Sequence, residues 1–183
     1  MKKLYTKKEI IKLSLYFYLA IFSNFSLSES FFDAGESSIK IISESDNVKE
    51  NDSLLLGLVF ELEEGWHTYW KNPGDSGEGA SIKWELPKGF KASTILWPGP
   101  ERIPFDPLMT YGYENEAILL TKIQSPKEFS DSIKIIANVN WLTCKEICIP
   151  QKGQVELTLK KGPKINNAYT AMLNEAALTV PKP

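Results

Sequence analysis

The stretch Ile133–Pro150, which reads IKIIANVNWLTCKEICIP, decides the fold of this chain. In its first half every second residue is apolar. Strict alternation of this kind is typical of a β-strand with one face in the core and the other in solvent. The sequence therefore predicts a half-buried strand that leads directly into a pair of cysteines. The apolar positions are Ile133, Ile135, Ala137, Val139 and Trp141.

The pair consists of Cys144 and Cys148, the only two cysteines in the chain. An extended backbone would separate their α-carbons by about 13 Å, whereas a disulfide needs roughly 4.4 to 6.8 Å. The three residues between them must therefore turn, either as a three-residue hairpin loop or as one helical turn. Both forms would display Lys145–Ile147 at the tip.

The close spacing of the cysteines bears on their use. Closing a loop of about five residues stabilises a fold by only ~2 kcal/mol, against ~4.7 kcal/mol for about a hundred residues. A pair that served only to stabilise the fold would be better placed far apart. Exchange needs an exposed sulfur, an attacking thiolate and a second thiol that resolves the mixed disulfide, so this spacing favours repeated oxidation and reduction.

Period-2 alternation also dominates the chain from Ser37 onward, with Gly, Pro, Asn and Asp between the apolar runs. Seven or eight short strands with turn signals between them indicate an all-β fold, a two-sheet antiparallel β-sandwich. Besides the strand in 133–141, we expect strands at 38–43, 54–62, 66–71, 80–86, 92–97, 117–124 and 154–160.

The C-terminal segment differs from the rest, because it is rich in alanine. Asn166 is placed to cap a short helix that runs through Ala177. We therefore divide the chain into a signal peptide (1–28), a β-sandwich domain (29–165) and a short helix with a tail (166–183).

The signal peptide is predicted from five lysines and an apolar stretch, Leu13–Phe22, that is short for a membrane span. Small residues at Ser26–Ser28 suit a signal peptidase. The alternative is an uncleaved N-terminal anchor. Either way the remainder would be exported, and we expect a periplasmic domain in which a lone cysteine pair is oxidised by default.

Charge, length and hydropathy limit the number of domains and the kinds of partner that the mature chain can have. The first 28 residues carry five Lys and one Glu, so their removal changes the formal charge from −2 to −6, which argues against nucleic acid. The 155 residues left suffice for one domain. No later apolar run reaches the roughly 20 residues of a membrane helix, so we expect no direct membrane span after cleavage.

Other candidate sites are weaker. His67 is the only histidine, and a lone histidine on a strand is more often a packing or surface residue than a base or ligand. The Gly-rich segment Asn72–Gly79 has no Gly-Lys-Ser/Thr ending and is read as a loop. Two cysteines and one histidine fall short of a zinc site. We expect no cofactor and no bound metal.

Three blocks of the sequence carry a resemblance to a known family: Glu64–Gly77, Trp97–Tyr113 and Trp141–Pro150. Gly-Trp-His-Thr-Tyr-Trp in the first and Cys-x-x-x-Cys-Ile-Pro in the last form a fairly specific combination. The chain resembles the N-terminal periplasmic domain of the DsbD and ScsB family of thiol:disulfide interchange proteins. The Cys-x-x-x-Cys spacing is closer to the ScsB-like branch.

The resemblance implies an immunoglobulin-like β-sandwich that is a component of a protein-disulfide reductase. A DsbD-type membrane reductase, acting through a thioredoxin-like domain, would donate electrons, and periplasmic thiol-oxidoreductases, including those of cytochrome c biogenesis, would be clients. Cys148 would form mixed disulfides and Cys144 would resolve them. A cap over 101–113 would shield the pair. The implied supporting residues near the pair are His67, Tyr69, Phe105, Met109 and Trp141.

Two alternatives stay open. Two thiolates and a histidine suit a soft cation such as Cu(I), which would make this a copper-handling protein. A non-catalytic interaction domain, in which the disulfide merely pins a hairpin, is the other. The 183 residues hold neither membrane spans nor a thioredoxin-like Cys-x-x-Cys, so either those parts are separate proteins or the fold serves another purpose.

Overall fold

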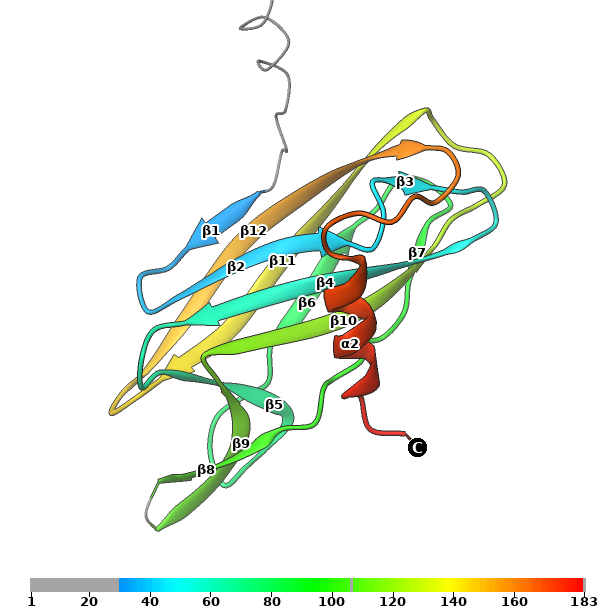
Figure 1. Ribbon diagram of the computed structural model, residues 1–183. Helices are drawn as coiled ribbons and strands as arrows, with labels where there is room; N and C mark the ends of the chain where they lie inside the picture. The colour runs from blue at the N-terminus through cyan, green and yellow to red at the C-terminus, as the bar shows by residue number, and fades with distance from the viewer. Residues whose placement is uncertain (1–29, 106, 183) are drawn as a thin grey trace, which may run out of the picture.

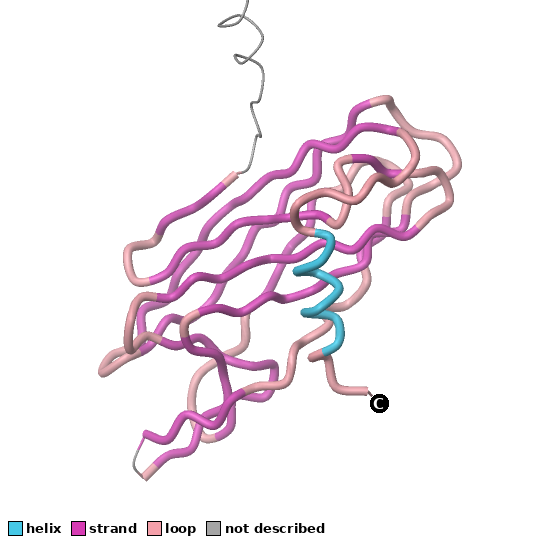
Figure 2. Tube along the Cα trace, in the orientation of Figure 1, coloured by secondary structure: helices cyan, strands magenta, loops and turns pink. Residues whose placement is uncertain are grey.

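A computed structural model describes residues 30–105 and 107–182. Two β-sheets pack face to face, and one short helix lies against the outside of the first sheet (Figure 1). Strands dominate the chain, as the tube drawing in Figure 2 shows. The predicted all-β, immunoglobulin-like sandwich with a short C-terminal helix is confirmed. The predicted signal peptide lies outside the described residues.

The first sheet has the strand order β1-β2-β4-β10-β7, and all of its neighbours are antiparallel. Its two long central strands, β4 and β10, pair over nine residues each. The strands are β1 (Phe31–Asp33), β2 (Ser37–Ser43), β4 (Ser53–Leu62), β7 (Lys91–Ala92) and β10 (Glu116–Gln124).

The second sheet has the order β3-β12-β11-β5-β9-β8, with β6 beside β11 as well. Its spine is the β11–β12 hairpin, which pairs from Ser132 and Lys160 to Cys144 and Cys148. The strands are β3 (Asn47–Val48), β5 (His67–Gly74), β6 (Ser81–Glu85), β8 (Glu101–Phe105), β9 (Leu108–Glu114), β11 (Ser132–Cys144) and β12 (Cys148–Lys161).

The core lies between the sheets and follows the predicted alternation. On β11 the odd-numbered residues from Ile133 to Trp141 are buried, and on β4 the even-numbered residues from Leu54 to Phe60 face them. Trp141 packs edge-on against Phe60, with ring centroids 5.8 Å apart. This geometry is a favourable one for aromatic pairs.

Helix α2 (Thr170–Leu178) covers the opposite face of the first sheet. Leu173 is fully buried there. A Cβ on Gly57 of β4 would lie 2.5 Å from the Leu173 side chain, so the absence of a side chain at Gly57 lets the helix dock.

The predicted helix start at Asn166 is wrong, because the segment before Thr170 is tied to the sandwich. Asn166 forms a bridge with Ser45, and the Asn167 side chain bonds the Ser43 carbonyl and the Tyr169 amide. The helical hydrogen bonds begin only after these contacts.

The other differences between the expected and the observed strands lie at the edges of the two sheets. The strand expected at 92–97 shrinks to Lys91–Ala92 plus a single bridge at Leu96. The cap segment at 101–113 is a β-hairpin, β8–β9, at the lower end of the sandwich in Figure 1. Pro104 is tolerated in β8 because β8 is an edge strand.

Candidate functional site: a disulfide at a hairpin tip

The two cysteines face each other across the end of the β11–β12 hairpin. Cys144 and Cys148 are direct cross-strand partners with α-carbons 4.1 Å apart, and their sulfurs are bonded at 2.03 Å. Lys145–Ile147 form the loop, in which the Lys145 amide donates to the Ile147 carbonyl. Of the two predicted forms of the turn, the structure has the three-residue hairpin loop.

The two halves of the disulfide differ in their surroundings. Cys144 pairs with His67 of β5 on its other side and is 1% exposed. Cys148 is exposed at the start of β12. Apart from β11, the only described strand that pairs with β12 is β3, and it does so at the end of β12 far from Cys148. A thiolate from another protein can therefore approach Cys148 but not Cys144.

His67 and Tyr69 lie beside the disulfide, as the resemblance implies. They are two residues apart on β5 and share a face of the strand. The His67 Nε2 atom lies 3.3 Å from the Tyr69 hydroxyl oxygen, which in turn lies 3.5 Å from Cys148 Sγ. These contacts form a continuous chain from the buried imidazole to the exposed sulfur.

Burial sets the protonation of both rings. Desolvation lowers the pKa of His67, and the nearby Glu114 carboxylate opposes this shift. Desolvation also raises the pKa of Tyr69, against a hydrogen bond from Ser76. Both side chains are therefore neutral at pH 7, as an imidazole and a phenol.

A small cavity of about 220 Å³ opens next to the disulfide. Leu108 and Thr110 of β9 line one side of it, and the loop residues Lys145 and Glu146 line another. Leu108 is 37% exposed and Ile147, at the loop tip, is 67% exposed. The cavity wall thus combines the exposed apolar side chain of Leu108 with charged side chains, and the exposed Ile147 directly precedes Cys148 in the chain.

Of the other residues expected near the pair, neither Trp141 nor Met109 lines this cavity. Trp141 is 3% exposed in the core and donates to Ser37 Oγ. Met109 is half-buried; its backbone bonds Asp75, and Leu108 rather than Met109 lines the cavity. Phe105 belongs to β8, where its backbone pairs with Leu108.

Sequence reasoning missed Ser76, Leu108 and Thr110 as site residues. Ser76 lies in a Gly-rich loop and the other two in the segment expected to form the cap. Their position in the three blocks that carry the resemblance was the only available signal, because each of them lies more than 30 residues from either cysteine in the chain.

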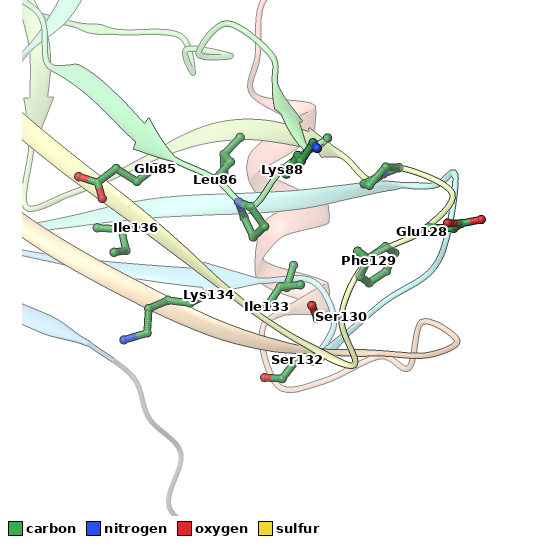
Figure 3. A pocket seen from close by; sticks show the side chains of 13 residues that line it. Glu85, Leu86, Lys88, Glu128, Phe129, Ser130, Ser132, Ile133, Lys134 and Ile136 are labelled. Carbon is green, nitrogen blue, oxygen red and sulfur yellow. The ribbon is translucent and has the colours of Figure 1, made fainter.

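A larger hollow of about 710 Å³ lies at the other end of β11 (Figure 3). Its lining includes Phe129, Ile133 and Ile136, with Glu85 and Lys134 at its margin. Ile136 and Cys144 are eight positions apart on β11, which corresponds to roughly 26 Å. This hollow is therefore not part of the disulfide site.

Within residues 30–105 and 107–182, no group of three or more His, Cys, Asp or Glu side chains is placed to hold a metal ion. In the same part of the chain, no helix is long and apolar enough to cross a bilayer.

Fold and site together define an immunoglobulin-like sandwich that carries a half-accessible disulfide at the tip of a hairpin. A family model described as "Thiol:disulfide interchange protein DsbD, N-terminal" matches residues 40–160. The chain belongs to this family of thiol:disulfide interchange domains.

One solved structure supports this fold. The N-terminal periplasmic domain of ScsB from Proteus mirabilis is 21% identical, with a TM-score of 0.63 over 84% of this chain. This chain covers 58% of the ScsB domain, which is less than two thirds of that domain's length. The reduced DsbD N-terminal domain of Neisseria meningitidis is 12% identical, with a TM-score of 0.35 over 70% of this chain and 88% of that one. No curated protein sequence matches the chain.

Proposed function

We propose that the chain is a periplasmic exchange module that takes electrons from a membrane-linked, thioredoxin-like reductase and passes them to client proteins. The observation that carries this proposal is the asymmetry of the disulfide: Cys148 is exposed, whereas Cys144 is buried. Family membership supports the class of reaction, and the periplasmic ScsB domain supports the compartment.

In the forward reaction, the Cys148 thiolate attacks one sulfur of a client disulfide. The client S–S bond breaks, its other sulfur leaves as a thiolate, and a mixed disulfide with Cys148 forms. The Cys144 thiol then loses its proton and attacks Cys148 Sγ, which releases the second client sulfur. The client gains two electrons and takes up two protons from water, and the Cys144–Cys148 disulfide is restored.

The donor resets the pair by the same chemistry. Its thiolate attacks Cys148 Sγ, the accessible sulfur, and Cys144 leaves as a thiolate. A second donor thiol then resolves the mixed disulfide, so the donor ends oxidised and the domain ends with two thiols. One sulfur thus meets both partners in turn, and the partners compete for one surface.

Trapping tests this assignment. Reduced Cys144→Ala protein, mixed with a small protein oxidoreductase that carries an exposed Cys-x-x-Cys disulfide, should accumulate a covalent adduct on a non-reducing gel. Wild-type protein should show little adduct, because Cys144 resolves it. Cys148→Ala is the matched control and should form none. Adducts of equal yield with both variants, or with neither, would contradict the proposal.

A further inference from the structure

The Gly-rich loop between β5 and β6 folds back over the ring of Tyr69. Gly77 has a φ of +95°, and a Cβ there would lie 2.3 Å from the Tyr69 Cε1 and Cζ atoms. Any other residue would therefore push the ring aside, besides being strained at this φ. Ser76 adds a hydrogen bond to the Tyr69 hydroxyl.

The loop is itself fastened to the β8–β9 hairpin. The Asp75 amide donates to the Met109 carbonyl at 3.1 Å, and the Met109 amide donates to Asp75 Oδ2 at 2.8 Å. The His67 ring also packs edge-on against Tyr69, with ring centroids 5.2 Å apart. Both the loop and His67 thus hold the phenol in place.

The held hydroxyl points to one sulfur only. A disulfide sulfur has no hydrogen, so the phenol is the donor in the 3.5 Å contact with Cys148 Sγ. The same oxygen can then accept hydrogen bonds from His67 Nε2–H and from Ser76. With both acceptor positions used, its single hydrogen is left for the sulfur.

We propose that Tyr69 is a catalytic residue of the exchange reaction, whose hydroxyl donates a hydrogen bond to the Cys148 thiolate, and that His67, Ser76 and Gly77 are positioning residues that aim it. This inference rests on the proposed function and assigns a task to the Gly-rich loop between β5 and β6. A hydrogen bond to the charged form of a group favours that form. Tyr69 therefore raises the fraction of Cys148 that can attack at neutral pH.

The phenol donates a hydrogen bond without giving up its proton. Burial raises the pKa of Tyr69 above its ordinary value of 10, so the phenol stays protonated beside the sulfur. Among the described residues, the charged groups around the site are Lys145 and Glu146 in the cavity wall and Glu114 next to His67. They stay unchanged in the variants below.

The test is the pH profile of alkylation of the fully reduced full-length protein by iodoacetamide, with the modified cysteine located by mass spectrometry. Tyr69→Phe keeps the ring and removes the hydroxyl. It should move the midpoint of Cys148 alkylation upward by about one pH unit, which corresponds to a thiolate about tenfold scarcer at low pH. Tyr113→Phe is the matched control, because that buried hydroxyl donates to the Pro98 carbonyl instead.

A second pair of variants serves if Tyr69→Phe fails to fold. His67→Leu removes the donor to the phenol and should shift the midpoint in the same direction, while His67→Gln, which keeps an N–H, should restore it. A Tyr69→Phe or His67→Leu profile that matches the Tyr113→Phe profile would overturn the inference. Adduct trapping by Cys144→Ala would be unaffected by that result, so the two proposals fail separately.

Discussion

At the scale of single residues, the site depends on unequal burial. Cys144 is covered by β5, whereas Cys148 is open to solvent, and the polar chain from His67 through Tyr69 ends on the open sulfur. The turn between the two cysteines could be predicted from chain geometry, because an extended chain would hold their α-carbons too far apart for a disulfide. The neighbours Ser76 and Leu108 could not, since only tertiary packing brings them to the pair.

His67 makes stability depend on pH. Burial lowers its pKa below 6.5 in the folded state, so the unfolded chain binds more protons as the pH falls through 6.5. The free energy of unfolding should therefore fall between pH 7.5 and pH 5.5, as measured by urea denaturation. Because His67 is the only histidine, His67→Gln should flatten this dependence. An equal slope in the variant would show that other groups cause it.

At the scale of elements, strands with strict alternation were predictable, and β2, β4, β10 and β11 lie within one to three residues of the expected bounds. The hairpin β8–β9 was not, because its prolines and irregular pattern are typical of loops. Its strands form where β9 pairs with β5, a contact between segments distant in sequence. The resulting edge brings Leu108 to the rim of the disulfide.

The loop tip should contribute to client capture. Ile147 is 67% exposed beside Cys148, so its side chain is free to pack on an apolar client surface. Ile147→Ser should slow adduct formation by the Cys144→Ala protein several-fold without a change in the urea midpoint. Ile165→Ser is the control, since Ile165 is 61% exposed but lies far from the pair in the chain. Equal rates in both variants would exclude a role for the tip.

Helix α2 should behave as part of the sandwich. Leu173 is fully buried against Ile42, Val59 and Leu120, so Leu173→Ala should lower the free energy of unfolding by about 2 to 5 kcal/mol. On the same helix Leu178 is 86% exposed, and Leu178→Ala should change it by less than about 0.5 kcal/mol. If urea denaturation gave similar losses of unfolding free energy for Leu173→Ala and Leu178→Ala, the helix would not dock as described.

At the scale of the whole molecule, the packed core of the sandwich supports the hairpin whose tip carries the disulfide. The core is continuous from Ile133 to Trp141 along β11, and it ends just before the disulfide. The bond itself closes so short a loop that it contributes only ~2 kcal/mol. The fold can therefore hold its shape while the pair is opened and closed, which an exchange module requires.

If the Cys144–Cys148 pair exchanges with other thiols, its reduction potential must lie in the range of exchangeable protein disulfides. The oxidised protein would be equilibrated in glutathione or dithiothreitol buffers of defined ratio, and free thiols would be counted after quenching. Exchangeable protein pairs lie between about −270 and −180 mV, and the pair should fall in this range. A potential well below about −300 mV would mark a structural disulfide and contradict the account.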